Sequence, residues 1–124
     1  MKLITEEIKA KLASNKGDAN IDKPYLKLFN PTGEGTWLIS EMIDEDTLFG
    51  LCDLGMGFPE LGYVSLQELE SVELPFGLKI ERDMYFTPDK TLSEYTELAR
   101  QHQRIVMNES TDPVINMMNI LADD

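Results

Sequence analysis

The sequence has no lysine or arginine between Lys27 and Lys79, and the chain as a whole has few basic residues. It contains 11 lysines and arginines against 23 acidic residues, with a formal net charge of -12. A negative field of this kind repels nucleic-acid phosphates and anionic lipids, and it attracts basic protein surfaces. We therefore expect no direct nucleic-acid or membrane partner. Solubility alone is the alternative explanation of the charge. The carboxylates in the interval without bases are Glu34, Glu41, Asp44, Glu45, Asp46, Asp53, Glu60, Glu68, Glu70 and Glu73.

Cysteine and histidine each occur once. Cys52 cannot form an internal disulfide, and its apolar neighbours predict a buried small side chain in a reducing compartment. His102 falls in an apolar helical stripe, which favours a structural role and leaves acid–base chemistry to carboxylates. A Cys–His pair formed through the fold is the alternative. The sequence predicts no metal ligands and no bound cofactor.

Long hydrophobic runs are also absent. No segment is apolar over the length that spans a bilayer, and the first residues become charged before a signal-type region develops. We therefore expect a cytoplasmic protein. With 42% hydrophobic and 27% charged residues, the 124-residue chain has the composition of a globular protein. Its length predicts a single domain over residues 1–124.

Strand patterns lie between helix signals. Thr5, followed by Glu6 and Glu7, predicts a short amphipathic helix that ends at residues 15–17. Aromatic and branched residues then predict strands over residues 25–29, 37–42, 47–53 and 61–64. The first three are joined by short connectors, which favour an antiparallel meander.

The second half of the chain carries two capping boxes. Ser65 with Glu68 predicts a helix through residue 72, and Thr91 with Glu94 predicts a longer one. Asp112 before Pro113 predicts a last helix, with its methionines available for packing. The expected fold class is α+β, with an N-terminal helix, a small antiparallel sheet of about four strands, and C-terminal helices. The apolar face of the longer helix contains Leu92, Tyr95, Leu98, Ala99, His102, Ile105 and Val106.

Two charged clusters are candidate sites. Asp44, Glu45 and Asp46 offer hard oxygen ligands, but they lack the glycine and terminal glutamate of a calcium loop, so a solvated turn is the expected structure. In Glu81-Arg82-Asp83, an arginine between carboxylates can form bidentate pairs that hold a backbone segment in place.

Residues 60–83 carry the pieces ELGYxSLxELESV and GLxIERD, and Thr36-Trp37, Phe49-Gly50 and Phe86 accompany them. On these motifs the chain resembles a bacterial family catalogued as domain of unknown function 2958. The resemblance covers residues 1–94 and leaves residues 95–124 as a C-terminal helical extension. It implies a small cytoplasmic protein of mobile genetic elements without an established enzyme activity, and some relatives are linked to inhibition of CRISPR effector nucleases.

Charge and resemblance together predict a non-catalytic interaction protein that binds a basic protein surface, with a nucleic-acid-binding host-defence protein as the candidate partner. One alternative is a carboxylate-based, metal-dependent enzyme using Asp46, Glu60, Glu81 or Asp83. Another is a self-associating module that buries a methionine-rich C-terminal face. The predicted partner-binding residues are Trp37, Glu41, Asp44, Glu45, Asp46, Glu60, Glu68, Glu81, Arg82 and Asp83.

Overall fold

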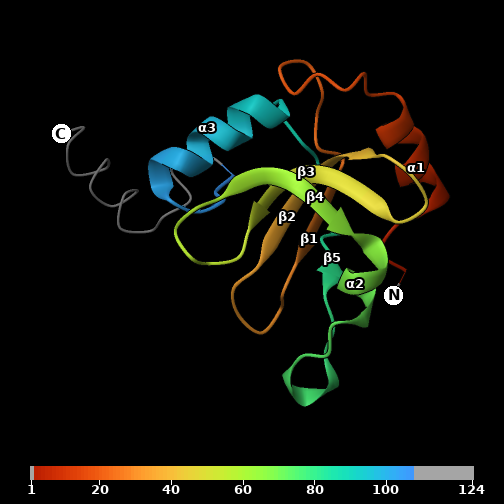
Figure 1. The fold of residues 1–124 in the computed structure, drawn as a ribbon, viewed down its shortest axis with the longest axis vertical. Coiled ribbons are helices and arrows are strands. Elements are labelled where there is room, and N and C mark those ends of the chain that lie inside the picture. Colours follow the sequence, from red (N-terminus) through yellow and green to blue (C-terminus); the bar gives the residue numbers. More distant parts are fainter. Residues whose placement is uncertain (1, 108–124) are drawn as a thin grey trace.

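The structure is a computed structural model that describes residues 2–107 (Figure 1). Four strands form an antiparallel meander, and a fifth strand returns to pair with the first, so the sheet order is β4-β3-β2-β1-β5. This confirms the expected α+β class. The helix expected after Asp112 lies outside the described residues. The elements are α1 (Glu6–Ala13), β1 (Leu26–Phe29), β2 (Thr36–Met42), β3 (Thr47–Asp53), β4 (Glu60–Ser65), α2 (Leu66–Ser71), η1 (Pro75–Gly77), β5 (Glu81–Arg82) and α3 (Leu92–His102).

Helices cover both faces of the sheet (Figure 1). On one face, Trp37, Ile39 and Leu48 pack with residues of α1 and α2 in a core that includes Leu12 and Leu69. On the other face, Leu38 and Leu51 pack against α3 residues, among them the almost fully buried Tyr95. Because side chains alternate along a strand, neighbouring residues of β2 contribute to different cores.

Helix starts follow the expected local chemistry. The Thr5 hydroxyl accepts from the Ile8 amide, and Thr91 and Glu94 form a complete capping box. At α2, Ser65 Oγ accepts from the Glu68 amide, as expected, and at the same time donates to Asp46 Oδ2 at 2.7 Å. Asp46 also accepts from the Gln67 amide. A carboxylate from the β2–β3 turn therefore helps to cap α2.

The end of α3 differs from the expected apolar stripe. The helix ends at His102, because Gln103 adopts a left-handed conformation with φ of 59°. Ile105 and Val106 therefore lie beyond the helix, although Val106 is buried. The Ile105 amide donates to Asp53 Oδ2 at 2.8 Å, which ties this segment to β3. Asp53 is consequently a buried structural carboxylate and not part of the acidic exterior.

Close backbone contact explains one glycine in the sheet centre. A Cβ atom on Gly50 would lie 2.0 Å from the Leu38 carbonyl oxygen. The register between β2 and β3 shifts between Ile39 and Glu41, next to this contact. Gly62, the β4 partner of Gly50, has no atom within 4 Å of the position of its missing Cβ. The paired glycines thus have opposite surroundings, one crowded and one open.

Candidate binding site

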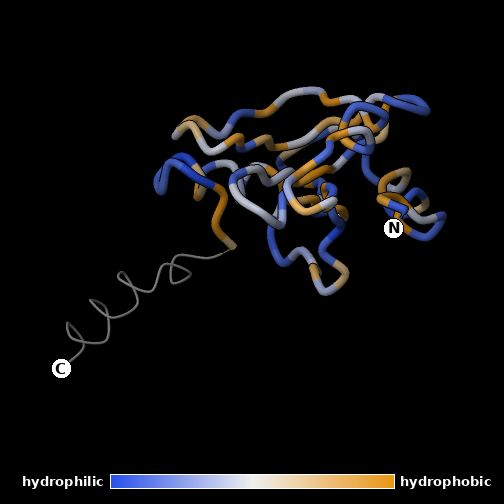
Figure 2. Tube along the Cα trace, turned by 90° about the horizontal axis from the view of Figure 1, so that it is seen from below, coloured by the Kyte–Doolittle hydropathy of each residue, from blue (hydrophilic) through white to orange (hydrophobic). Residues whose placement is uncertain are grey.

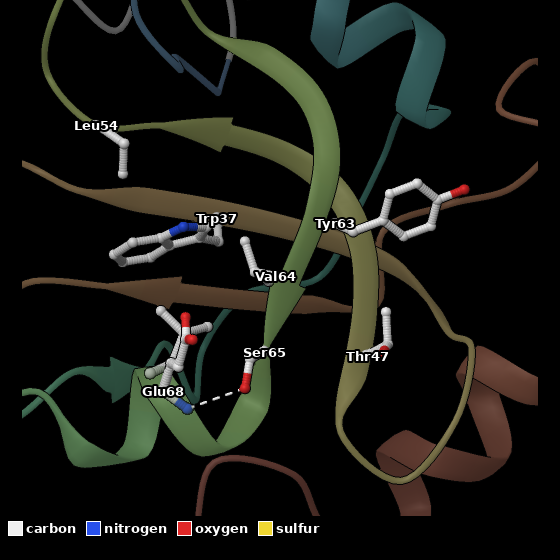
Figure 3. A pocket seen from close by; sticks show the side chains of 8 residues that line it. Trp37, Thr47, Leu54, Tyr63, Val64, Ser65 and Glu68 are labelled. Carbon is white, nitrogen blue, oxygen red and sulfur yellow. Dashed lines mark hydrogen bonds between the residues drawn. The ribbon is translucent and has the colours of Figure 1, made fainter.

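An open pocket of about 400 Å³ lies between β4 and α2 (Figure 3). This volume falls within the range of roughly 300–1,000 Å³ that is common for ligand sites. Figure 3 shows Trp37 and Glu68 on one side of β4, with the Tyr63 ring pointing away from them. The lining residues are Trp37, Thr47, Leu54, Tyr63, Val64, Ser65, Glu68 and Leu69.

The sheet register places the indole and a carboxylate on the same face. Trp37 pairs with Cys52, and Cys52 pairs with Glu60, so the three residues form one row across β2, β3 and β4. Trp37 is 7% exposed and belongs to the core on the α2 face. Glu60 is exposed at the start of β4. An aromatic residue and an acid therefore share this side of the sheet.

The cap of α2 fixes the position of the second carboxylate. Glu68 lies in the first turn of α2, whose start is held by Ser65 and Asp46. The Leu66 amide also donates to the Asp46 carbonyl at 2.7 Å. Asp46, predicted as a binding residue, is half-buried and engaged in these bonds. We therefore describe it as a support of the site. The name β4–α2 site is used below for Trp37, Val64 and Glu68, which line the pocket, together with Glu60, which lies on the same sheet face at the other end of β4.

The carboxylates at this site form no ion pair within the described residues. Within residues 2–107, the ion pairs join Lys9 to Glu6, Lys11 to Glu7, Lys27 to Asp83 and Lys90 to Asp89. None of these pairs, over the described part of the chain, uses a carboxylate from the interval without bases. Glu60 and Glu68 are thus available to an external cation.

Three predicted residues lie near the β2–β3 turn. Asp44 and Glu45 are exposed there, and Glu41 is half-buried near the end of β2. Asp44 Oδ1 accepts from the Asp46 and Thr47 amides, and these hydrogen bonds lower the pKa of its carboxyl. Asp44 therefore closes the turn, which agrees with the solvated turn expected from the sequence.

The remaining predicted residues lie at the opposite edge of the sheet, at β5. Glu81 and Arg82 form β5, which pairs with β1. Arg82 Nη1 donates to the Lys2 carbonyl, and Asp83 Oδ2 lies 3.5 Å from Lys27 Nζ. The expected locking role of this segment is seen, although these contacts join it to Lys2 and Lys27.

The predicted binding residues consequently do not form one continuous surface. Asp46 bonds to the last residue of β4, whereas Glu60 is the first residue of that strand. At about 3.4 Å per residue, the two ends of β4 lie roughly 17 Å apart. Glu81 and Asp83 are farther away, across the whole sheet order. Trp37 and Glu68 line the pocket, with Asp46 as support, whereas Glu60 shares only the sheet face, at the far end of β4.

The arrangement of the described side chains does not support a metal-dependent reaction. Within residues 2–107, no three His, Cys, Asp or Glu side chains lie close enough to share a metal ion. Burial raises the pKa of the Cys52 thiol to about 11, so the nucleophilic thiolate is scarce at neutral pH. The described residues also include no helix long and apolar enough to cross a bilayer.

Two features of the site were not predicted from the sequence. Leu54 is 57% exposed at the pocket margin, and Val64 forms part of the pocket wall. Gly62 leaves open space beside them. The alternation of Glu60, Gly62 and Val64 on one strand face was the available signal.

Residues 3–106 match the family described as protein of unknown function, DUF2958, and the chain belongs to this family. The match includes α3, which the expected boundary near residue 94 leaves outside. No curated protein and no solved structure gives a significant match.

Proposed function

We propose that this protein is a non-catalytic binding protein whose β4–α2 site receives a basic side chain from another protein. The main support for this proposal is the pocket in which Trp37 and Glu68 lie together, in a part of the chain without lysine or arginine. A guanidinium or ammonium group over an indole gains about 0.5–2 kcal/mol, depending on desolvation. A charge-assisted hydrogen bond to a carboxylate adds to this attraction.

The partner class follows from the charge. A net charge of -12 speeds association with basic surfaces at low ionic strength. Basic protein surfaces commonly hold nucleic-acid phosphates, so a carboxylate-bearing protein can compete with nucleic acid for them. The proposed partner is therefore a nucleic-acid-binding protein, and the family resemblance favours a host-defence protein encountered by a mobile genetic element in the cytoplasm.

The alternatives have less support. The enzyme would gather carboxylates from among Asp46, Glu60, Glu81 or Asp83 in a pocket, whereas Asp46 and Glu60 lie at opposite ends of β4 and Glu81 and Asp83 lie at the other edge of the sheet. Self-association through the methionine-rich segment stays a hypothesis, because that segment lies outside the described residues.

Competition binding tests the proposal. The purified protein would be titrated into a basic nucleic-acid-binding domain, with and without bound nucleic acid, at low and high salt. The double variant Glu60→Gln/Glu68→Gln should weaken binding about tenfold, because it removes charge-assisted bonds. The control Glu70→Gln/Glu73→Gln removes the same charge from exposed positions outside the pocket and should retain affinity. Equal losses of affinity in both double variants, or no binding of the unmodified protein at low salt, would contradict the proposal.

A further inference from the structure

The outer edge of β4 is open. β4 is the first strand in the sheet order, so only its inner edge pairs, with β3. Within the described residues, no backbone hydrogen bond to another element involves residues 60–64 on the outer side. Its outward N–H and C=O groups can therefore pair with an added strand.

This edge lacks the features that usually prevent such pairing. Proteins commonly protect long edges with lysine, proline or a bulge, and the sequence ELGYVS of β4 has no lysine or proline. Apolar side chains are exposed on the strand and in the loop before it. Tyr63 is 68% exposed and Phe58 is 78% exposed. Figure 2 shows hydrophobic residues at the turn of the β3–β4 loop.

The two faces of β4 differ in chemistry. Tyr63 stacks on Phe49 at a centroid distance of 5.0 Å, on the face covered by α3. Glu60, Gly62 and Val64 alternate on the α2 face, beside the pocket with Trp37 and Glu68. An added strand would place apolar residues beside Tyr63 and long basic residues over Gly62, because side chains alternate.

Charge complementarity indicates what kind of chain segment binds at the β4 edge. A second copy would bring another -12 charge and would place its own Glu60 against the same edge. Residues 108–124 of this chain contain acids but no lysine or arginine, so they cannot supply the basic side chain. We infer that the β4 edge binds an extended segment of a basic partner protein, in which apolar and basic residues alternate and one arginine or lysine enters the Trp37–Glu68 pocket.

The inference rests on the proposed function and specifies how the partner is held. Backbone hydrogen bonds along β4 supply affinity, and side-chain positions supply specificity, as in other cases of strand addition. The open space at Gly62 admits the stem of the basic side chain, and the Glu68 carboxylate in the pocket meets its charge. A Cβ atom added at Gly62 would have no atom within 4 Å, so a larger residue there begins in that open space.

Peptide binding provides the test. The probe is a peptide of alternating valine and arginine, compared with one of the same composition in which the arginines are consecutive. Binding would be followed through the fluorescence of Trp37, the chain's single tryptophan, and through hydrogen exchange of the β4 amides. We expect tighter binding of the alternating peptide, protection of outward β4 amides, and about tenfold weaker binding to Gly62→Leu.

Gly33→Leu, at an exposed turn with ordinary φ, is the matched control and should bind like the unmodified protein. Equal binding of both peptides, unprotected β4 amides, or unchanged affinity in Gly62→Leu would overturn strand addition while leaving the proposed function in place. Failure of every arginine peptide to bind at low salt would overturn both.

Discussion

The two edges of the sheet are built in opposite ways. The β5 edge is two residues long, and its charged side chains contact other parts of the protein. Arg82 donates to the Lys2 carbonyl, while Asp83 pairs with Lys27, whose Nζ also lies 5.9 Å from the Phe86 ring centroid. The β4 edge is six residues long and exposes both aromatic and acidic side chains.

The two edges are therefore expected to affect different properties, β5 the stability of the fold and β4 the binding of a partner. Arg82 and the adjacent Asp83 have partners within the fold, so their loss should affect the free energy of unfolding. Glu60, the charged residue of β4, is exposed, so under the proposed function its loss should weaken partner binding. The sheet therefore has one edge that closes the fold and one that is available for recognition.

The largest expected effect comes from glycines that pair across β3 and β4. Gly50→Ala should lower the free energy of unfolding by about 3 kcal/mol or prevent folding, because the new Cβ would overlap the Leu38 carbonyl. Gly62→Ala meets open space and should change stability by about 0.5 kcal/mol, in the stabilising direction. Urea denaturation measures both. Similar losses in the free energy of unfolding of the two variants would contradict the crowded surroundings of Gly50 and the open surroundings of Gly62.

Asp83→Ala tests the closed edge. It leaves the half-buried Lys27 without its carboxylate and removes the acceptor of the Tyr85 amide. We expect a loss of about 1 kcal/mol in the free energy of unfolding. Glu68→Ala, in the first turn of α2 directly after the open-edge strand, should change it by less than about 0.5 kcal/mol. A greater loss for Glu68→Ala, measured by thermal or urea denaturation, would reverse the assignment of the edges.

Tyr63→Lys tests the open edge. The variant loses the ring contact with Phe49, which should cost about 0.5–1 kcal/mol of stability. It also places a lysine on the edge strand, a feature that opposes strand pairing. The alternating peptide should therefore bind more weakly to this variant. Tyr63→Phe keeps the ring and should retain both the stability and the peptide affinity of the unmodified protein in the same measurements.

The smallest expected effect is the pH dependence of the β2–β3 turn. Hydrogen bonds from the Asp46 and Thr47 amides lower the pKa of Asp44 in the folded state. A lowered folded pKa stabilises the protein above the unfolded value, near 3.9, and this stabilisation is lost as the pH falls through the folded pKa. Asp44→Asn should therefore reduce the melting temperature at pH 7, with the difference disappearing as the pH falls below the lowered pKa of Asp44 in the folded state. A difference that grows on acidification would contradict this cause.

Local chemistry made much of the fold predictable. The Thr5 and Thr91 helix starts and the four longer strands were predicted correctly, because caps and side-chain alternation depend on nearby residues. β5 was missed since two residues carry no periodic pattern, and its pairing with β1 depends on distant sequence. The end of α3 was missed because Gln103 adopts a left-handed conformation that its residue type does not favour.

The site was predicted only in part. Trp37, Glu60 and Glu68 were named from charge and aromatic character, and the structure places Trp37 and Glu68 in one pocket and Glu60 on the same sheet face. Asp46 was named as exposed charge, yet it caps α2 across 19 to 21 residues of sequence. Asp53 is likewise bound to the Ile105 amide. Sequence reveals how many carboxylates exist, but long-range pairing decides which of them point outward.

The raised pKa of Cys52 has a practical consequence. Because its thiol stays protonated at neutral pH, maleimide or iodoacetamide reagents should react slowly with the natural chain. A second cysteine placed at the exposed Glu70 position can then carry a spin label or fluorophore without prior removal of the native thiol. Distances from such a probe to a labelled peptide would report the direction in which an added strand runs.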